Sequence, residues 1–182
     1  AGDSAGGGLA LATALALRDA GEPAPAALVL FSPWVDLATP DTPPPEPPGE
    51  AMLGWESISA CARLYVDGGA TAPDGGPGGS LTHPLVSPLR ADLRGLPPVL
   101  IQAGTDELLH PQALALHDAL KAAGGDVRCE ITPNRWHVFQ LHANALPSAD
   151  AAIDRVARFV LGPLAAATPP TASEHQVVIL GA

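Results

Sequence analysis

Basic residues and long apolar runs are both scarce in this sequence. Nine Lys and Arg stand against nineteen Asp and Glu, which gives a formal net charge of −10. A surface of that sign repels phosphate backbones and anionic lipid, so we expect no nucleic-acid partner. The longest apolar candidate, Leu9–Leu17, falls well short of the roughly 18 residues that a membrane span requires. We therefore expect no stable insertion into a membrane.

Cysteine is scarce too, and no metal or cofactor signature is visible. Cys61 and Cys129 lie far apart and match no metal or redox spacing, so we expect two buried free thiols, with one disulfide as the alternative. Glu107 and His110 resemble a fragment of a zinc motif that no second histidine completes. Asp3 stands where a signal peptide would be basic. The sequence thus predicts a cytoplasmic protein without metal or cofactor.

What the sequence does contain is an alternation of strand-like and helical segments. Hydrophobic residues make up 47% of 182 residues, which is enough for one packed domain. Alternation of this kind predicts an α/β fold with a mostly parallel sheet flanked by helices. The expected strands are Ala26–Phe31, Pro98–Ala103 and, nearer the sheet edge, Val127–Thr132; the expected helices are Gly6–Arg18, Ser57–Val66, Pro111–Ala123 and Ala149–Leu161.

Loops and a tail interrupt this alternation. Pro40–Gly49 contains six prolines, which favours an exposed extended loop, and Ala70–Gly79 is a second loop candidate. We place one domain at residues 1–161 and a linker with a tail at residues 162–182. Within that tail, Ala165–Ser173 has the composition of a linker, and Gln176–Ala182 reads as a further buried strand.

The first residues carry the clearest chemical signal. Gly2-Asp3-Ser4-Ala5-Gly6 is a Gly-x-Ser-x-Gly sequence that leads directly into a helix. A nucleophilic serine in such a motif sits on a tight strand-to-helix turn with strained backbone angles, and we expect a Cβ at either glycine to collide with neighbouring backbone. The alternative is a glycine-rich turn that only caps a helix.

A serine nucleophile needs a base within hydrogen-bonding reach and an acid that orients the base. Asp106 follows the strand Pro98–Ala103, and His137 follows the strand Val127–Thr132. The chain order serine, acid, histidine is that of α/β-hydrolases, and functional groups gather at the carboxyl ends of parallel strands. We therefore predict Ser4, Asp106 and His137 as a catalytic triad.

Each partner of Ser4 has rivals. Glu107 could orient the histidine in place of Asp106, and Asp106 could instead be the N-cap of the following helix. Asp36 also follows a strand, where a structural role is the more common one. Only His137 has the strand-then-loop context; the other histidines are His83, His110, His117, His142 and His175.

Taken together, these stretches resemble the hormone-sensitive-lipase-like family of bacterial esterases and lipases. The matching segments are GDSAGG at residues 2–7, SPWVDL at 32–37, HPLVSPL at 83–89, LPPVLIQAGTDELL at 96–109 and WHVFQL at 136–141. The resemblance implies Ser4 as the nucleophile, Asp106 as the acid, His137 as the base and the Ala5 backbone N–H as an oxyanion-hole donor. It implies hydrolysis of small to medium apolar acyl esters through an acyl-enzyme, without a cofactor.

Two departures from the family pattern affect this interpretation. An HGGG-type segment, which supplies further oxyanion donors in the family, and the strand that leads into the serine are both missing before Ser4. The chain therefore resembles the C-terminal part of an α/β-hydrolase. A binding-only or inactive fragment is the main alternative to an esterase, and a serine peptidase on the same fold is the other.

The end of the chain suggests a further partner. VVILGA at residues 177–182 resembles the first strand and glycine of a Rossmann domain that binds a flavin or nicotinamide. A fused oxidoreductase domain in the parent protein is one interpretation of this resemblance, and the less favoured one. A buried strand with no cofactor role is the alternative.

Overall fold

The computed structural model describes residues 1–38, 43, 45–67 and 79–166. In these residues four parallel strands form one sheet in the order β1-β2-β3-β4. The strands are β1 (Gly2–Asp3), β2 (Leu28–Phe31), β3 (Val99–Gly104) and β4 (Val127–Thr132). The helices are α1 (Ser4–Asp19), α2 (Trp55–Asp67), α3 (His110–Ala122) and α4 (Pro147–Ala166), with short 3₁₀ helices η1 (Pro88–Arg90) and η2 (Phe139–His142).

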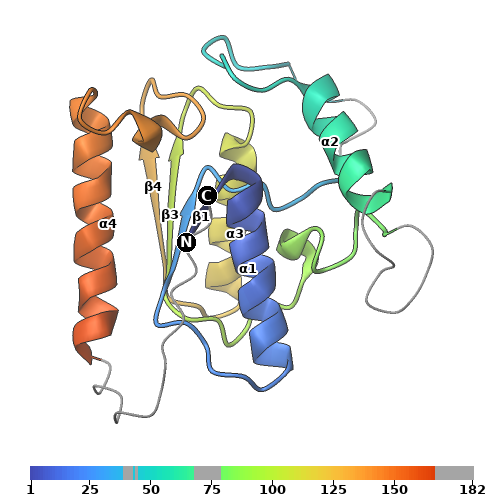
Figure 1. Ribbon diagram of the computed structural model, residues 1–182, viewed down its shortest axis with the longest axis vertical. Helices are drawn as coiled ribbons and strands as arrows, with labels where there is room; N and C mark the ends of the chain where they lie inside the picture. Colours follow the sequence, from blue (N-terminus) through green and yellow to red (C-terminus); the bar gives the residue numbers. More distant parts are fainter. Residues whose placement is uncertain (39–42, 44, 68–78, 167–182) are drawn as a thin grey trace.

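The sheet lies between two helical layers, as Figure 1 shows with α1 and α3 on one side and α4 on the other. The main core joins Leu11 and Leu15 of α1, Leu116 and Leu120 of α3, and inward-facing strand residues such as Ile101. A smaller cluster packs α4 against η2 on the opposite face. This arrangement confirms the predicted α/β fold with a parallel sheet flanked by helices.

The apolar runs marked the buried strands correctly. All six residues of β3 are buried, as its continuous hydrophobic run predicts for a strand covered on both faces. β4 is only partly buried and lies at one edge of the sheet, also as predicted. The prediction that no strand leads into Ser4 is wrong, because Gly2 and Asp3 pair with Leu30 and Phe31 of β2.

Differences from prediction concentrate at helix ends and loops. α4 runs through Gly162 to Ala166, so it extends past the boundary that we placed after residue 161. In the proline-rich stretch, residues 43, 45, 46, 48 and 49 are exposed, in agreement with a loop. Most of the second loop candidate and the tail strand at Gln176–Ala182 lie outside the described residues, so the division into a domain and a tail stays a prediction.

The two cysteines are both free thiols, but only partly as expected. Cys61 on α2 is exposed rather than buried, and Cys129 on β4 is half-buried. In the described part of the chain, no helix combines the length and the apolar character needed to cross a membrane.

Candidate active site

Ser4 lies at the junction of β1 and α1, where the chain turns sharply at the carboxyl edge of the sheet. Its backbone is in the left-handed region, with φ at 50°, as a strained strand-to-helix turn requires. The Trp34 backbone N–H donates to the Ser4 carbonyl oxygen at 2.9 Å and ties this turn to the segment that follows β2. The hydroxyl is thereby presented at the start of a helix.

The glycines around Ser4 differ in how closely other atoms approach them. A Cβ at Gly2 would overlap the Gly6 carbonyl, as predicted, but a Cβ at Gly6 would meet nothing within 4 Å. The close approaches lie further along α1, where Gly7 faces Pro33 and Gly8 faces the Trp34 carbonyl. The expectation of a collision is therefore correct for Gly2 and wrong for Gly6.

His137 reaches Ser4 from the loop after β4. Its Nε2 lies 2.9 Å from the Ser4 Oγ, although the two residues are 133 positions apart. The ring is almost fully buried, with 3% of the residue exposed. The structure thus brings together the serine and the histidine that the sequence singled out.

The acid beside His137 is Glu107, and the prediction of Asp106 at this position is corrected. The Glu107 Oε2 lies 2.8 Å from the His137 Nδ1, and its Oε1 accepts a hydrogen bond from the Gly104 backbone N–H at 2.9 Å. Glu107 has no exposed surface. A buried carboxylate needs such partners, because an unpaired buried charge is costly.

The Asp106 side chain does not face His137, because Asp106 takes part in hydrogen bonds that join the loops after β3 and β4. Its backbone N–H donates to the Arg135 carbonyl, and its Oδ1 accepts from the Thr105 hydroxyl at 2.7 Å. The same hydroxyl accepts from the Asn134 N–H at 2.9 Å. The Asp106 side chain faces Gly49 of the proline-rich segment. It is not a helix N-cap either, because α3 begins at His110 with Leu109 in the cap position.

The contacts of His137 match one tautomer of its ring. An ionised carboxylate only accepts hydrogen bonds, so opposite an ionised Glu107 the ring proton of a neutral His137 lies on Nδ1. Nε2 is then a free acceptor for the proton of the Ser4 hydroxyl. This tautomer is the one in which a histidine can take a proton from serine.

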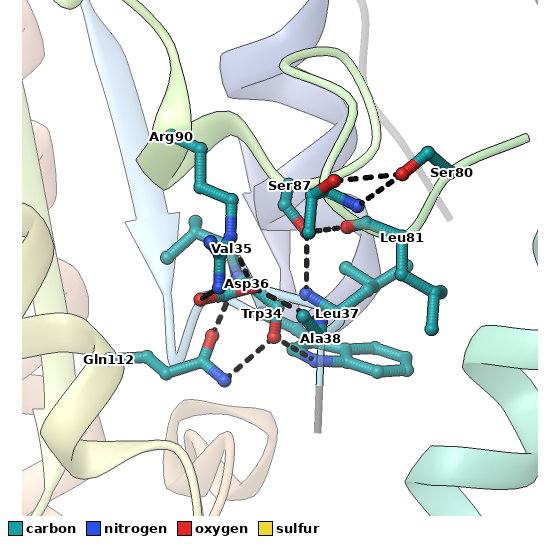
Figure 2. A network of polar contacts seen from close by, with 11 residues as sticks. Trp34, Val35, Asp36, Leu37, Ala38, Ser80, Leu81, Ser87, Arg90 and Gln112 are labelled. Atoms are coloured by element: carbon teal, nitrogen blue, oxygen red, sulfur yellow. Dashed lines mark hydrogen bonds and ion pairs between the residues drawn. The ribbon is translucent and has the colours of Figure 1, made fainter. Parts of the chain in front are cut away.

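Asp36 is a structural acid, in agreement with its expected role. Figure 2 shows its carboxylate paired with Arg90, with contacts of 3.1 and 2.8 Å. This pair raises the pKa of the Arg90 guanidinium, first through the hydrogen bond and then through charge attraction. Gln112 of α3 binds the same segment, since its Oε1 accepts from the N–H groups of Val35 and Asp36. These bonds fix the chain that in turn holds Ser4.

The remaining described histidines take other positions in the structure. His110 starts α3, and His117 pairs with Asp118. His142 ends η2 and meets the Trp136 ring edge-on. His83 accepts from the Leu85 N–H. His175 lies outside the described residues.

Ala5 is the second residue of α1, at the end where backbone N–H groups have no partner within the helix. A helix N-terminus also favours negative charge. The position therefore suits an oxyanion donor next to the Ser4 hydroxyl. In residues 1–38, 43, 45–67 and 79–166, no group of three or more His, Cys, Asp or Glu side chains could hold a metal ion.

Comparison with known proteins identifies the group to which this site belongs. Residues 1–141 match a family model described as the alpha/beta hydrolase fold. An acetyl-hydrolase of Streptomyces hygroscopicus is 42% identical over 161 residues, which cover 88% of this chain and 50% of that protein. An esterase of Acinetobacter venetianus is 33% identical over 159 residues, which cover 87% of this chain and 50% of that protein.

Solved structures agree with these relatives. A crystal structure of an esterase/lipase from an uncultured bacterium superposes with a TM-score of 0.79 at 36% identity, covering 90% of this chain and 52% of that one. A crystal structure of an esterase from the bacterial hormone-sensitive lipase family superposes with a TM-score of 0.77 at 38% identity, with the same coverage of both chains. This chain spans about half the length of these relatives. It belongs to the α/β-hydrolase fold family and is similar, within it, to bacterial esterases of the hormone-sensitive lipase group.

Proposed function

We propose that this chain carries the catalytic groups of a serine carboxylester hydrolase, with Ser4 as nucleophile, His137 as general base and Glu107 as the acid that orients His137. The observation that carries the proposal is the continuous line of contacts from Glu107 through His137 to Ser4, at 2.8 and 2.9 Å. Serine esterases and lipases need such a relay to activate an alcohol at neutral pH.

The reaction proceeds in two halves. The Ser4 Oγ attacks the ester carbonyl carbon while His137 Nε2 takes the hydroxyl proton, and the tetrahedral intermediate collapses when His137 returns that proton to the leaving alcohol. Water then attacks the acyl-enzyme, again with His137 as base, and releases the carboxylic acid. Glu107 stays ionised throughout and stabilises the imidazolium that forms in each half.

The negative charge of each intermediate forms on the former carbonyl oxygen. Ala5 is in the right place to donate its backbone N–H to that oxygen, because it directly follows the nucleophile in α1. A single donor of this kind contributes about 10²–10³ to turnover. We propose that the remaining donors come from an HGGG-type segment of the whole protein. The chain spans about half the length of the relatives it matches.

Short apolar acyl esters are the proposed substrates. A relative with 42% identity is named an acetyl-hydrolase, and other relatives are named esterase or triacylglycerol lipase. The acetyl group in the first of these names lies at the small end of the proposed small to medium range.

The test compares the chain with Ser4→Ala, using p-nitrophenyl acetate and butyrate. We expect kcat to fall by at least about 10³-fold, because the residual rate comes only from binding and oxyanion contacts. Ser80→Ala is the matched control, since Ser80 is exposed and its hydroxyl bonds to nearby Thr82. A fluorophosphonate probe should label the wild-type chain at Ser4 and leave Ser4→Ala unlabelled. Equal hydrolysis by both proteins, or no labelling of the wild type, would contradict the proposal.

A further inference from the structure

The residue next to His137 has an unfavourable backbone conformation. Val138 is in the left-handed region, with φ at 50° and ψ at 43°. A β-branched residue rarely adopts this conformation, which costs on the order of 1–3 kcal/mol. Val138 is also buried, at 4% exposure, so solvent does not stabilise its backbone groups. Some contact must hold it there.

The contact comes from Ser32, at the end of β2. The Ser32 Oγ accepts a hydrogen bond from the Val138 backbone N–H at 3.0 Å, across 106 positions of sequence. Ser32 is fully buried and is itself left-handed, with φ at 44°. Its own N–H donates to the Gln102 carbonyl of β3 at 2.7 Å. The hydroxyl is therefore anchored to the central sheet, which makes it a fixed acceptor.

We propose that Ser32 is a positioning residue for His137, because its hydroxyl keeps Val138 left-handed and thereby directs the imidazole at Ser4. This inference rests on the proposed esterase function and adds to it a residue whose hydroxyl binds the backbone beside His137 rather than a side chain of the triad. Rotation of Val138 towards its preferred negative φ turns the peptide that joins it to His137. We expect such a turn to lengthen the contact between His137 and Ser4, which is 2.9 Å in the structure.

A second set of hydrogen bonds holds another part of the same loop. Val138 is therefore the residue at which the loop can change its conformation. Gln140 donates its side-chain amide to the Gln102 Oε1 at 3.2 Å, and Gln102 in turn donates to Glu130 and to the Ala152 carbonyl. Gln102 and Gln140 are both buried. This network holds the far end of the loop, three residues after His137, but it does not touch the backbone N–H of Val138.

The test is a double-mutant cycle between Ser32 and Val138. In the wild-type background, Ser32→Ala should lower kcat on p-nitrophenyl butyrate about 10- to 100-fold with little change in KM, because misplacement of a catalytic group slows chemistry more than binding. Glycine adopts the left-handed conformation at no cost. In the Val138→Gly background, the same Ser32→Ala change should therefore lower kcat by less than about threefold.

Ser87→Ala is the matched control for loss of a buried serine. Ser87 is also fully buried, and its Oγ accepts from the Leu37 N–H and donates to the Leu81 carbonyl, as Figure 2 shows. Its removal should lower the midpoint of thermal unfolding and lower kcat much less than Ser32→Ala does. If Ser32→Ala lowers kcat equally in both backgrounds, or no more than Ser87→Ala does, Ser32 only packs the core and the inference is wrong.

A second variant and a second readout keep the test independent of folding and of activity. Ser32→Gly removes the hydroxyl but accepts the positive φ, so it should fold and show the same loss of kcat as Ser32→Ala. In proton NMR, the Nδ1 proton that His137 shares with Glu107 should give a downfield signal in wild type, Ser4→Ala and Ser87→Ala, and a shifted or broadened one in Ser32→Gly. An unchanged signal in Ser32→Gly would overturn the inference even if Ser4→Ala proved active.

Discussion

Asp106 and Glu107 are neighbours in the chain, and only one of the two carboxylates reaches the histidine. Both follow β3, and the position after the strand and the resemblance to known esterases favoured the first. The decisive feature is the length of the side chain combined with the direction of the turn. Asp106 leaves the turn towards Gly49, whereas Glu107 folds back far enough to bind the Gly104 N–H and His137 together. One-dimensional spacing contains no information about that direction.

Substitution of each acid by its amide separates the two roles. Glu107→Gln can no longer favour the His137 tautomer with its proton on Nδ1, so kcat should fall on the order of 10³–10⁴-fold. Asp106→Asn keeps an acceptor for the Thr105 hydroxyl and should retain kcat within about threefold. Turnover of p-nitrophenyl butyrate by the two purified variants checks both values, with circular dichroism to verify folding. A larger loss of kcat in Asp106→Asn than in Glu107→Gln would show that Asp106 is the orienting acid.

Other residues at the site differ in how readily the sequence revealed them. Ser4 and His137 were predictable because each stands in a pattern, a Gly-x-Ser-x-Gly turn and a strand followed by a loop. Ser32 and Val138 were not, because their importance arises from positive φ angles and from a bond across 106 positions. A serine after a strand gives no signal of either.

At the scale of elements, helix α1 owes its position to two glycines beyond the motif. Gly8 allows the helix to lie directly on the Trp34 carbonyl, and the Trp34 N–H holds Ser4. The sequence predicted the helix and the buried strands because their apolar patterns extend over many residues. It missed β1 because two residues cannot carry a periodic pattern.

Alanine at positions 6 and 8 should therefore have opposite effects on stability. Gly6→Ala places a methyl group in open space and improves helix propensity, so the free energy of unfolding should rise by about 0.5–1 kcal/mol. Gly8→Ala pushes the helix away from the Trp34 carbonyl and should lower the free energy of unfolding by about 1–3 kcal/mol. Urea unfolding followed by tryptophan fluorescence measures both. Equal destabilisation by the two substitutions would show that the motif glycine at position 6 has a packing role after all.

For the whole molecule, the sheet acts as the frame that brings distant segments to one edge. Ser4 directly follows β1, and the loops after β3 and β4 supply Glu107 and His137. The loop after β2 supports two of these residues through Trp34 and Ser32. Because these strands are parallel, their carboxyl ends meet at the same edge. The order of the strands was predictable only in part, since β4 could be placed at an edge from its partial polarity but its neighbour could not be named.

The alkylation rates of the two cysteine thiols test whether β4 stays packed at the edge of the sheet. Burial, and then the charges of Asp118 and Glu130, raise the pKa of the Cys129 thiol to about 11. At pH 8 only about one molecule in a thousand then carries the reactive thiolate, and Cys129 also packs against the main core. Iodoacetamide should accordingly modify exposed Cys61 at least tenfold faster in the native protein, and reach Cys129 at a comparable rate only in denaturant. Peptide mass spectrometry distinguishes the two sites over time. Equal native rates would mean that the β4 edge opens readily, and since β4 precedes His137, such opening would also separate the histidine from Ser4.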